Sequence, residues 1–165
     1  MDAEATCREA RLLAAEGRRD EALARVEALL TAEPAHLSAL ILRGDLFDAR
    51  REPAAALRAY AQATAVAPES AAGWNGQARQ LRALGRPSEA LAAAERARAL
   101  LSHGENFVQT GPVYLTLVWC LRDERRFQEA LALADEGLQR SSDAVLAEWA
   151  TQIEEEWAAA EKERC

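Results

Sequence analysis

The feature that most constrains the fold is a short phrase that recurs along the chain. Ala22, Ala56 and Ala90 follow one another at equal intervals, and each stands in a similar four-residue context that ends in leucine. A fourth copy is centred on Ala130 and comes six residues later than this interval would place it. A period of roughly 20–50 residues indicates a repeat architecture, in which each unit packs against its neighbours.

Every copy contains apolar residues at the spacing of an amphipathic helix, and no segment alternates as a half-buried strand does. The pattern therefore predicts an all-α fold. Small residues recur where paired helices would cross closely, because a longer side chain would push the helices apart. We expect eight repeat helices and a ninth helix, over residues 3–16, 19–32, 37–50, 53–66, 71–84, 87–101, 112–124, 127–140 and 143–163.

The predicted helix ends carry residues that suit them. Gly17 and Gly85 stand where a first helix should end, and this position favours a left-handed cap. Pro53, Pro87 and Pro112 fall near expected helix starts, where a missing N–H costs little.

The pattern resembles the tetratricopeptide repeat (TPR), a helix pair with small and bulky residues at fixed positions. The second copy carries the resemblance most fully, with Leu40, Gly44, Phe47, Ala56, Tyr60, Ala63 and Pro68. The resemblance covers residues 3 to about 143. It implies one domain, 1–165, folded as a right-handed α-solenoid of antiparallel helix pairs. The repeats would span 3–36, 37–70, 71–104 and 111–143, followed by a capping helix over 143–163.

The ninth helix has two interpretations. Its apolar stripe contains Leu146, Ile153 and Ala160 together with Trp149 and Trp157. Terminal repeats need a cap with a polar outer face, so the stripe can seal the last repeat. Two tryptophans on one stripe also suit self-association, which would make the chain a homodimer through Trp149 and Trp157.

Composition restricts the partners. The formal net charge of −7 disfavours nucleic acid, which needs clustered positive charge. No stretch is long and apolar enough for membrane insertion. The three cysteines are widely spaced without a CxxC pair, so we expect neither a disulfide framework nor a metal site, and we expect a reducing, cytoplasmic location.

The sequence offers no catalytic constellation. Its two histidines, His36 and His103, fall in predicted turns without a ligand cluster beside them. Nucleotide-binding, hydrolase and metalloprotease motifs are absent. We therefore expect neither catalysis nor a cofactor, and we expect the partner to be another protein or peptide.

The resemblance implies that the first helices of successive repeats line a concave groove. The groove positions that it assigns to partner binding are Arg11, Ile41, Asp45, Asp48, Asn75, Arg79, Arg82, Leu115, Trp119 and Arg122, beside the neighbouring positions Glu4, Cys7 and Ser38.

Three questions about the groove stay open at this point. The arginines either receive acidic groups of a partner or pair with nearby aspartates. Trp119 either anchors a partner in the groove or packs under the loop that precedes its helix. That loop, 102–111, contains the insertion, so Phe107 either contacts a partner or packs locally, with the sixth helix extended.

The resemblance also yields one negative prediction. A branch of the family grips C-terminal tails of heat-shock proteins with Lys and Asn side chains. Of the matching positions, only Arg11 could serve, since the others are Cys7, Leu42, Ala72 and Gly76. We expect no such docking. The function expected is a non-catalytic adaptor, with a dedicated bacterial chaperone, such as a secretion chaperone, or a self-assembling protein as alternatives.

Overall fold

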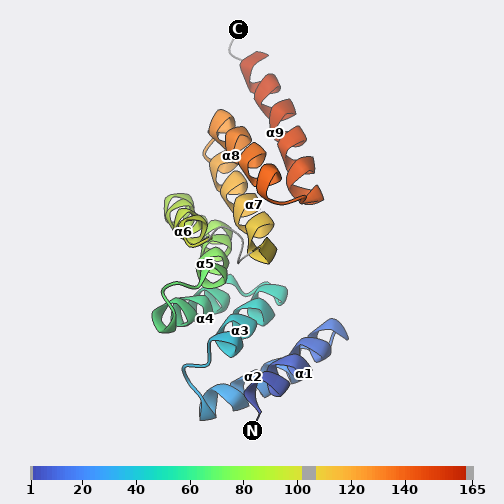
Figure 1. Cartoon of the computed structure of the whole chain (residues 1–165), viewed down its shortest axis with the longest axis vertical. Helices are drawn as coiled ribbons and strands as arrows, with labels where there is room; N and C mark the ends of the chain where they lie inside the picture. The colour runs from blue at the N-terminus through green and yellow to red at the C-terminus, as the bar shows by residue number, and fades with distance from the viewer. Residues whose placement is uncertain (1, 102–106, 163–165) are drawn as a thin grey trace.

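The chain folds into a stack of helix pairs, shown along its length in Figure 1. The structure is a computed structural model that describes residues 2–101 and 107–162, and within these ranges every regular element is an α-helix. In chain order the helices are α1 (Ala3–Ala15), α2 (Arg19–Ala32), α3 (Leu37–Ala49), α4 (Pro53–Val66), α5 (Ala71–Ala83), α6 (Pro87–Ala99), α7 (Phe107–Asp123), α8 (Phe127–Arg140) and α9 (Ala144–Lys162). No helix in these ranges is both long and apolar enough to cross a membrane.

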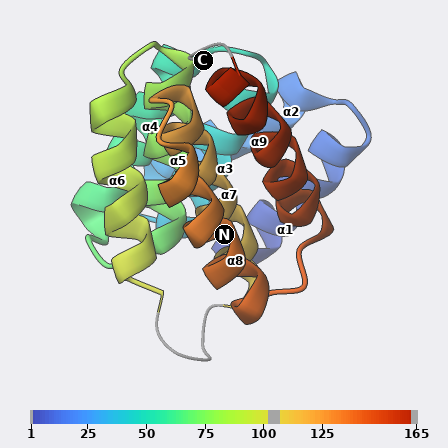
Figure 2. The ribbon, with the colours of Figure 1, turned by 90° about the horizontal axis from the view of Figure 1, so that it is seen from above.

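The helices pack as consecutive antiparallel pairs. Within each pair α1 contacts α2, α3 contacts α4, α5 contacts α6, and α7 contacts α8. The first helices also touch one another in succession, from α1 through α3 and α5 to α7. Helix α9 contacts both α8 and α7, which is the relation that a first helix has to the pair before it. Figure 2 shows the same helices viewed from above the stack.

The turns inside the four pairs share one backbone conformation. The second residue after each first helix is left-handed, with φ of 83° at Gly17, 59° at Arg51, 71° at Gly85 and 58° at Arg125. In each turn the following N–H bonds back to a carbonyl five residues earlier, as in a Schellman motif. The caps predicted at Gly17 and Gly85 are confirmed, and arginine adopts the same conformation in the other two turns.

The close crossing of helices is tightest around Tyr60 on α4. Its ring is 1% exposed and lies between Gly44 of its own repeat and Gly76 of the next. A Cβ at either glycine would lie 2.5–2.6 Å from a ring carbon. Tyr60 therefore fixes the distance between α3 and α5, where the two apolar clusters of the core meet.

Two predictions about the insertion are wrong. Helix α7 begins at Phe107, so Pro112 lies inside the helix and not at its start. Helix α6 ends at Ala99, so the inserted residues extend α7 backwards instead of lengthening the sixth helix. The remainder of the predicted loop, 102–106 with His103, and the side chain of Phe107 lie outside the described part of the structure.

The ninth helix covers the last repeat. Leu146 and Ile153 are fully buried and Ala160 is 7% exposed, so the predicted stripe faces the repeat stack. Trp149 and Trp157 are half-buried on the same side. The helix therefore has the position and the burial pattern of a cap.

Candidate functional site

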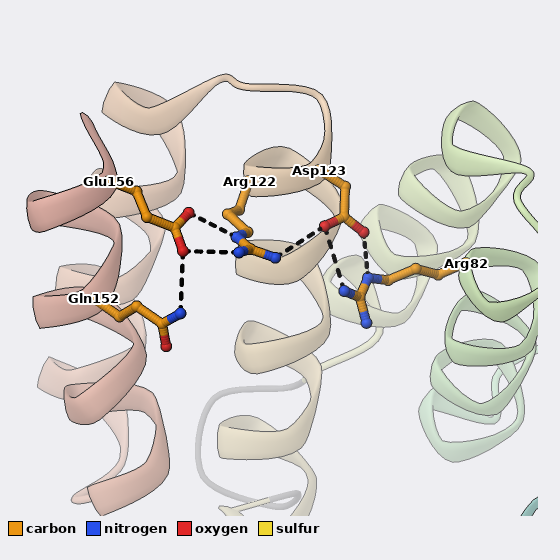
Figure 3. A network of polar contacts seen from close by, with 5 residues as sticks. All are labelled: Arg82, Arg122, Asp123, Gln152 and Glu156. Carbon is orange, nitrogen blue, oxygen red and sulfur yellow. Dashed lines mark hydrogen bonds and ion pairs between the residues drawn. The ribbon is translucent and has the colours of Figure 1, made fainter. Parts of the chain in front are cut away.

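Three arginine–carboxylate contacts connect neighbouring helices of the groove. Arg79 on α5 donates to Asp48 on α3, and Arg82 donates from Nε to Asp123 on α7 over 2.5 Å. Arg122 binds both carboxylate oxygens of Glu156 on α9, at 2.7 and 2.8 Å, and lies 3.5 Å from Asp123. The three contacts link α3, α5, α7 and α9 in succession, whereas Arg122 and Asp123 both lie on α7, and Figure 3 shows the C-terminal part.

Arg79, Arg82 and Arg122 are thus already compensated by carboxylates of the chain. The structure has the ion pairs of the second interpretation, with Glu156 as a carboxylate that the sequence did not indicate. The hydrogen bonds between Arg122 and Glu156 raise the pKa of the guanidinium and lower the pKa of the carboxyl group. Because all four side chains of this network are about 30% exposed, each pair is worth at most about 1 kcal/mol.

Trp119 lies against the ninth helix. Its ring meets Trp149 edge to face, with centroids 5.6 Å apart and planes at 79°. Arg82 lies over Trp119 at 5.3 Å, and Arg122 lies over Trp149 at 5.6 Å. The Trp119 Nε1 atom is buried without a hydrogen-bond acceptor among the described residues. Neither sequence interpretation of Trp119 included this contact with α9.

This packing also bears on the self-association prediction. Trp149 is turned toward α7 and not outward, so in this structure it belongs to the intramolecular contact. Trp157 is half-buried beside a small cavity that Arg126 and Phe127 also line. The homodimer stays a prediction.

A cavity on these helices lies between the second and third repeats. It has a volume of about 580 Å³ and is lined by residues of α3, of the following turn and of α5. Asp45 faces it and accepts a hydrogen bond of 2.6 Å from the Tyr60 hydroxyl. The protein around Asp45 displaces water and raises the pKa of its carboxyl group, although the hydrogen bond from Tyr60 and the charge of Arg79 oppose this shift.

Four other predicted groove positions differ from one another in solvent exposure. Arg11 on α1 is exposed and has no ion pair in the described ranges. Ile41 and Leu115 are half-buried and pack against the core clusters. Asn75 is only 3% exposed, and its Oδ1 has no hydrogen-bond donor in the described part of the chain. The expectation that Asn75 is open to the groove is therefore wrong, because neighbouring helices cover it.

Cys7 is also not a groove residue, because it is fully buried in the N-terminal core cluster. Burial raises the pKa of its thiol, which makes it unreactive. Across the described residues, no group of three or more His, Cys, Asp or Glu side chains is arranged to hold a metal ion.

Sequence reasoning missed three residues of this surface, namely Arg51, Arg125 and Glu156, and it did not predict that Trp149 packs against Trp119. A signal existed for Glu156, which stands one repeat period after Arg122 and so continues the period into the ninth helix. A signal also existed for the two turn arginines, which take the place of glycine when the four turns are aligned.

Comparison with known proteins gives neighbours in structure. No protein-family model matches the chain, and no curated protein matches its sequence. PilF of Pseudomonas aeruginosa superposes with a TM-score of 0.79 at 17% identity, over 97% of this chain and 72% of PilF. TTC0263, a thermophilic TPR protein of Thermus thermophilus, gives 0.78 at 20% identity, over 93% and 81%. The Yersinia enterocolitica type III secretion chaperone SycD, solved with a peptide of the translocator YopD, gives 0.67 at 16% identity, over 73% and 93%.

The stack of antiparallel pairs, with successive first helices in contact, defines a helical-repeat solenoid. The structural likeness then specifies which one: the chain has the right-handed tetratricopeptide-repeat fold, with four repeats and a capping helix. The resemblance seen in the sequence is confirmed at the level of the fold.

Proposed function

We propose that the chain is a non-catalytic adaptor that binds a segment of a partner polypeptide in its concave groove. The observation that carries this proposal is the cavity of about 580 Å³ between α3 and α5, at the positions of Asp45, Asp48 and Arg79. Its volume matches that of pockets which enclose a few side chains of a ligand. The ion pair beside it holds the lining side chains in defined positions.

The partner would contact three kinds of surface in this groove. The first is the polar cavity, and the second is the half-buried pair formed by Trp119 and Trp149. Aromatic side chains are preferred anchors, and truncating a true anchor costs about 2 kcal/mol or more of binding free energy. The third is Arg11 at the N-terminal end of the groove, which has no ion pair in the described residues.

The test is affinity capture from the native source with variants that keep the fold. Exchanging Asp48→Arg and Arg79→Asp together preserves the ion pair while reversing its polarity, so that a bound partner should be lost without loss of stability. Trp119→Ala should also reduce capture. The matched control is Arg96→Glu, an exposed side chain on α6 outside every described contact. Equal recovery of the same partners by all variants would refute the proposal.

A secretion chaperone is the second candidate. The observation in its favour is that 93% of SycD, which was solved with a translocator peptide, superposes on this chain. Identity of 16% shows only the fold, so the two candidates differ in the partner and not in the groove. Identification of the captured protein as an exported substrate would select the chaperone. Binding of a free heat-shock-protein tail that depends on its carboxylate would contradict our prediction about the tail-binding branch.

A further inference from the structure

Two cavities of the solenoid are built in the same way. The cavity of about 580 Å³ combines the turn after α3 with helix α5, and a second cavity of about 470 Å³ combines the turn after α7 with helix α9. On this side of each cavity several lining residues correspond at a constant spacing, which is two repeats plus the insertion, with Asp48, Arg51 and Pro53 at the positions of Arg122, Arg125 and Phe127. The side of the cavity formed by a first helix and its turn thus occurs twice, once between the second and third repeats and once between the fourth repeat and α9.

Each cavity contains one arginine that is compensated and one that is not. Arg79 pairs with Asp48 in the first cavity, and Arg122 pairs with Glu156 in the second. The side chains of Arg51 and Arg125, which line the same cavities, make no hydrogen bond or ion pair with the described residues. A guanidinium presents five N–H donors in a planar fork, and this geometry fits a carboxylate.

The backbone conformation of these turns does not require arginine. Arg51 and Arg125 have φ of 59° and 58°, in the left-handed region that disfavours any residue with a Cβ. The equivalent turns of the first and third repeats contain Gly17 and Gly85, which adopt this conformation without strain. A residue that strains its backbone where glycine serves in sister turns is expected to have a role beyond the turn.

The geometry points to two carboxylate-binding subsites, in which Arg51 and Arg125 each receive an acidic side chain of the partner polypeptide. This inference rests on the proposed function, since it names the chemistry of the same partner. Arg79, Arg82 and Arg122 are paired with the chain's own carboxylates, so an acidic residue gains more at Arg51 and Arg125 than at these three. No hydrogen bond or ion pair joins Asp45 to Arg51, and the Asp45 carboxylate accepts a hydrogen bond from Tyr60 instead.

The double site has a consequence for affinity. A partner that reaches both subsites binds the second one intramolecularly, so its affinity exceeds that of a segment which reaches only one. The partner must therefore be an extended or long helical segment with acidic side chains at two separated places.

The probe for this test is fluorescently labelled poly-L-glutamate in a short and a long form, titrated at about 0.15 M salt, where the Debye length is about 8 Å. At that salt the overall charge of −7 contributes little repulsion, so binding reports local contacts. We expect Arg51→Gly and Arg125→Gly each to weaken binding of the long probe about tenfold. In each variant the long probe should then bind no more tightly than the short probe. Arg96→Ala removes an equal charge elsewhere and should leave the affinity unchanged.

The same variants should change stability in the opposite direction. Glycine relieves the left-handed strain, so each variant should raise Tm by about 2–4 °C while binding falls. A raised Tm with affinity equal to that of the Arg96→Ala control would overturn the inference, and so would a lowered Tm, because the arginines would then support the fold. Failure of the proposed function is a separate result, since it is read from native partners captured by the variant with Asp48 and Arg79 exchanged.

Discussion

Replacing Gly76 with alanine tests the packing that sets the spacing of the second and third repeats. An added Cβ would lie 2.5 Å from two carbons of the Tyr60 ring, closer than real Cβ contacts come. The ring cannot retreat, because Gly44 closes its other side and the hydroxyl is bonded to Asp45. Overpacking of this kind costs about 1–3 kcal/mol, with the upper half expected for a ring confined on both faces.

Helix propensity acts in the other direction, since alanine in place of a helical glycine gains about 1 kcal/mol. The net expectation for Gly76→Ala is therefore a loss of about 1–2 kcal/mol, or a fall in Tm of about 2–8 °C for a chain of this size. Urea unfolding followed by circular dichroism measures the loss directly.

The double variant supplies the control. In a chain that already carries Tyr60→Leu, the obstructing ring is gone, and Gly76→Ala should become neutral or stabilising. A coupling of about 1 kcal/mol or more between the two sites is expected of residues in contact. If Gly76→Ala raises the unfolding midpoint of the otherwise unchanged chain, Tyr60 does not hold these helices apart and the reasoning is wrong.

Three further predictions concern the cap and one helix start. The hydrogen bonds from Arg122 lower the pKa of Glu156 in the folded state. The stabilisation by this pair is therefore present above the unfolded pKa of about 4.3 and is lost as pH falls through the lower folded pKa. Urea midpoints measured down the acid range should lose this pH dependence in the variant Glu156→Gln. Ile153→Ala removes a fully buried side chain and should lower the free energy of unfolding by about 2–5 kcal/mol. Tryptophan emission should shift to the red when α9 loosens. An unshifted spectrum with unchanged stability would contradict the capping role. Ser70→Ala should cost about 1 kcal/mol by calorimetry, because the hydroxyl accepts the Gly73 N–H over 3.2 Å at the start of α5, whereas Ser70→Asp should cost nothing.

The sequence was enough to predict the fold because one period constrains every element at once. Once Ala22, Ala56 and Ala90 are aligned, the helices, the turns at Gly17 and Gly85 and the lining helices follow from the same register. Seven of the first eight predicted helices agree with the structure within two residues at each end. The exception is α7, because a proline after a glycine is typical of a helix start, while here a turn of helix precedes Pro112.

For the candidate site, the sequence predicted which helix face each residue lies on, but it did not predict the contacts or the burial of the side chains. Helical periodicity places Arg79, Arg82 and Arg122 on one face, but it does not say which carboxylate each side chain will reach. Those partners come from the neighbouring first helices, and the distance between helices is set by Tyr60 and the glycines around it. Burial of Asn75 has the same origin, since periodicity assigns a face to a residue and only packing decides whether that face is covered.

The chain of ion pairs has a consequence for how this array can change. Arg79, Arg82 and Arg122 each find a carboxylate in an adjacent structural unit, so no repeat is electrically complete by itself. Deleting, duplicating or transplanting one of these repeats would bring two mismatched edges together and leave an arginine or a carboxylate without its partner. The repeats have similar backbones, but the ion pairs between them fix the order in which they follow one another. A rearrangement that preserves these ion pairs must keep neighbouring repeats together.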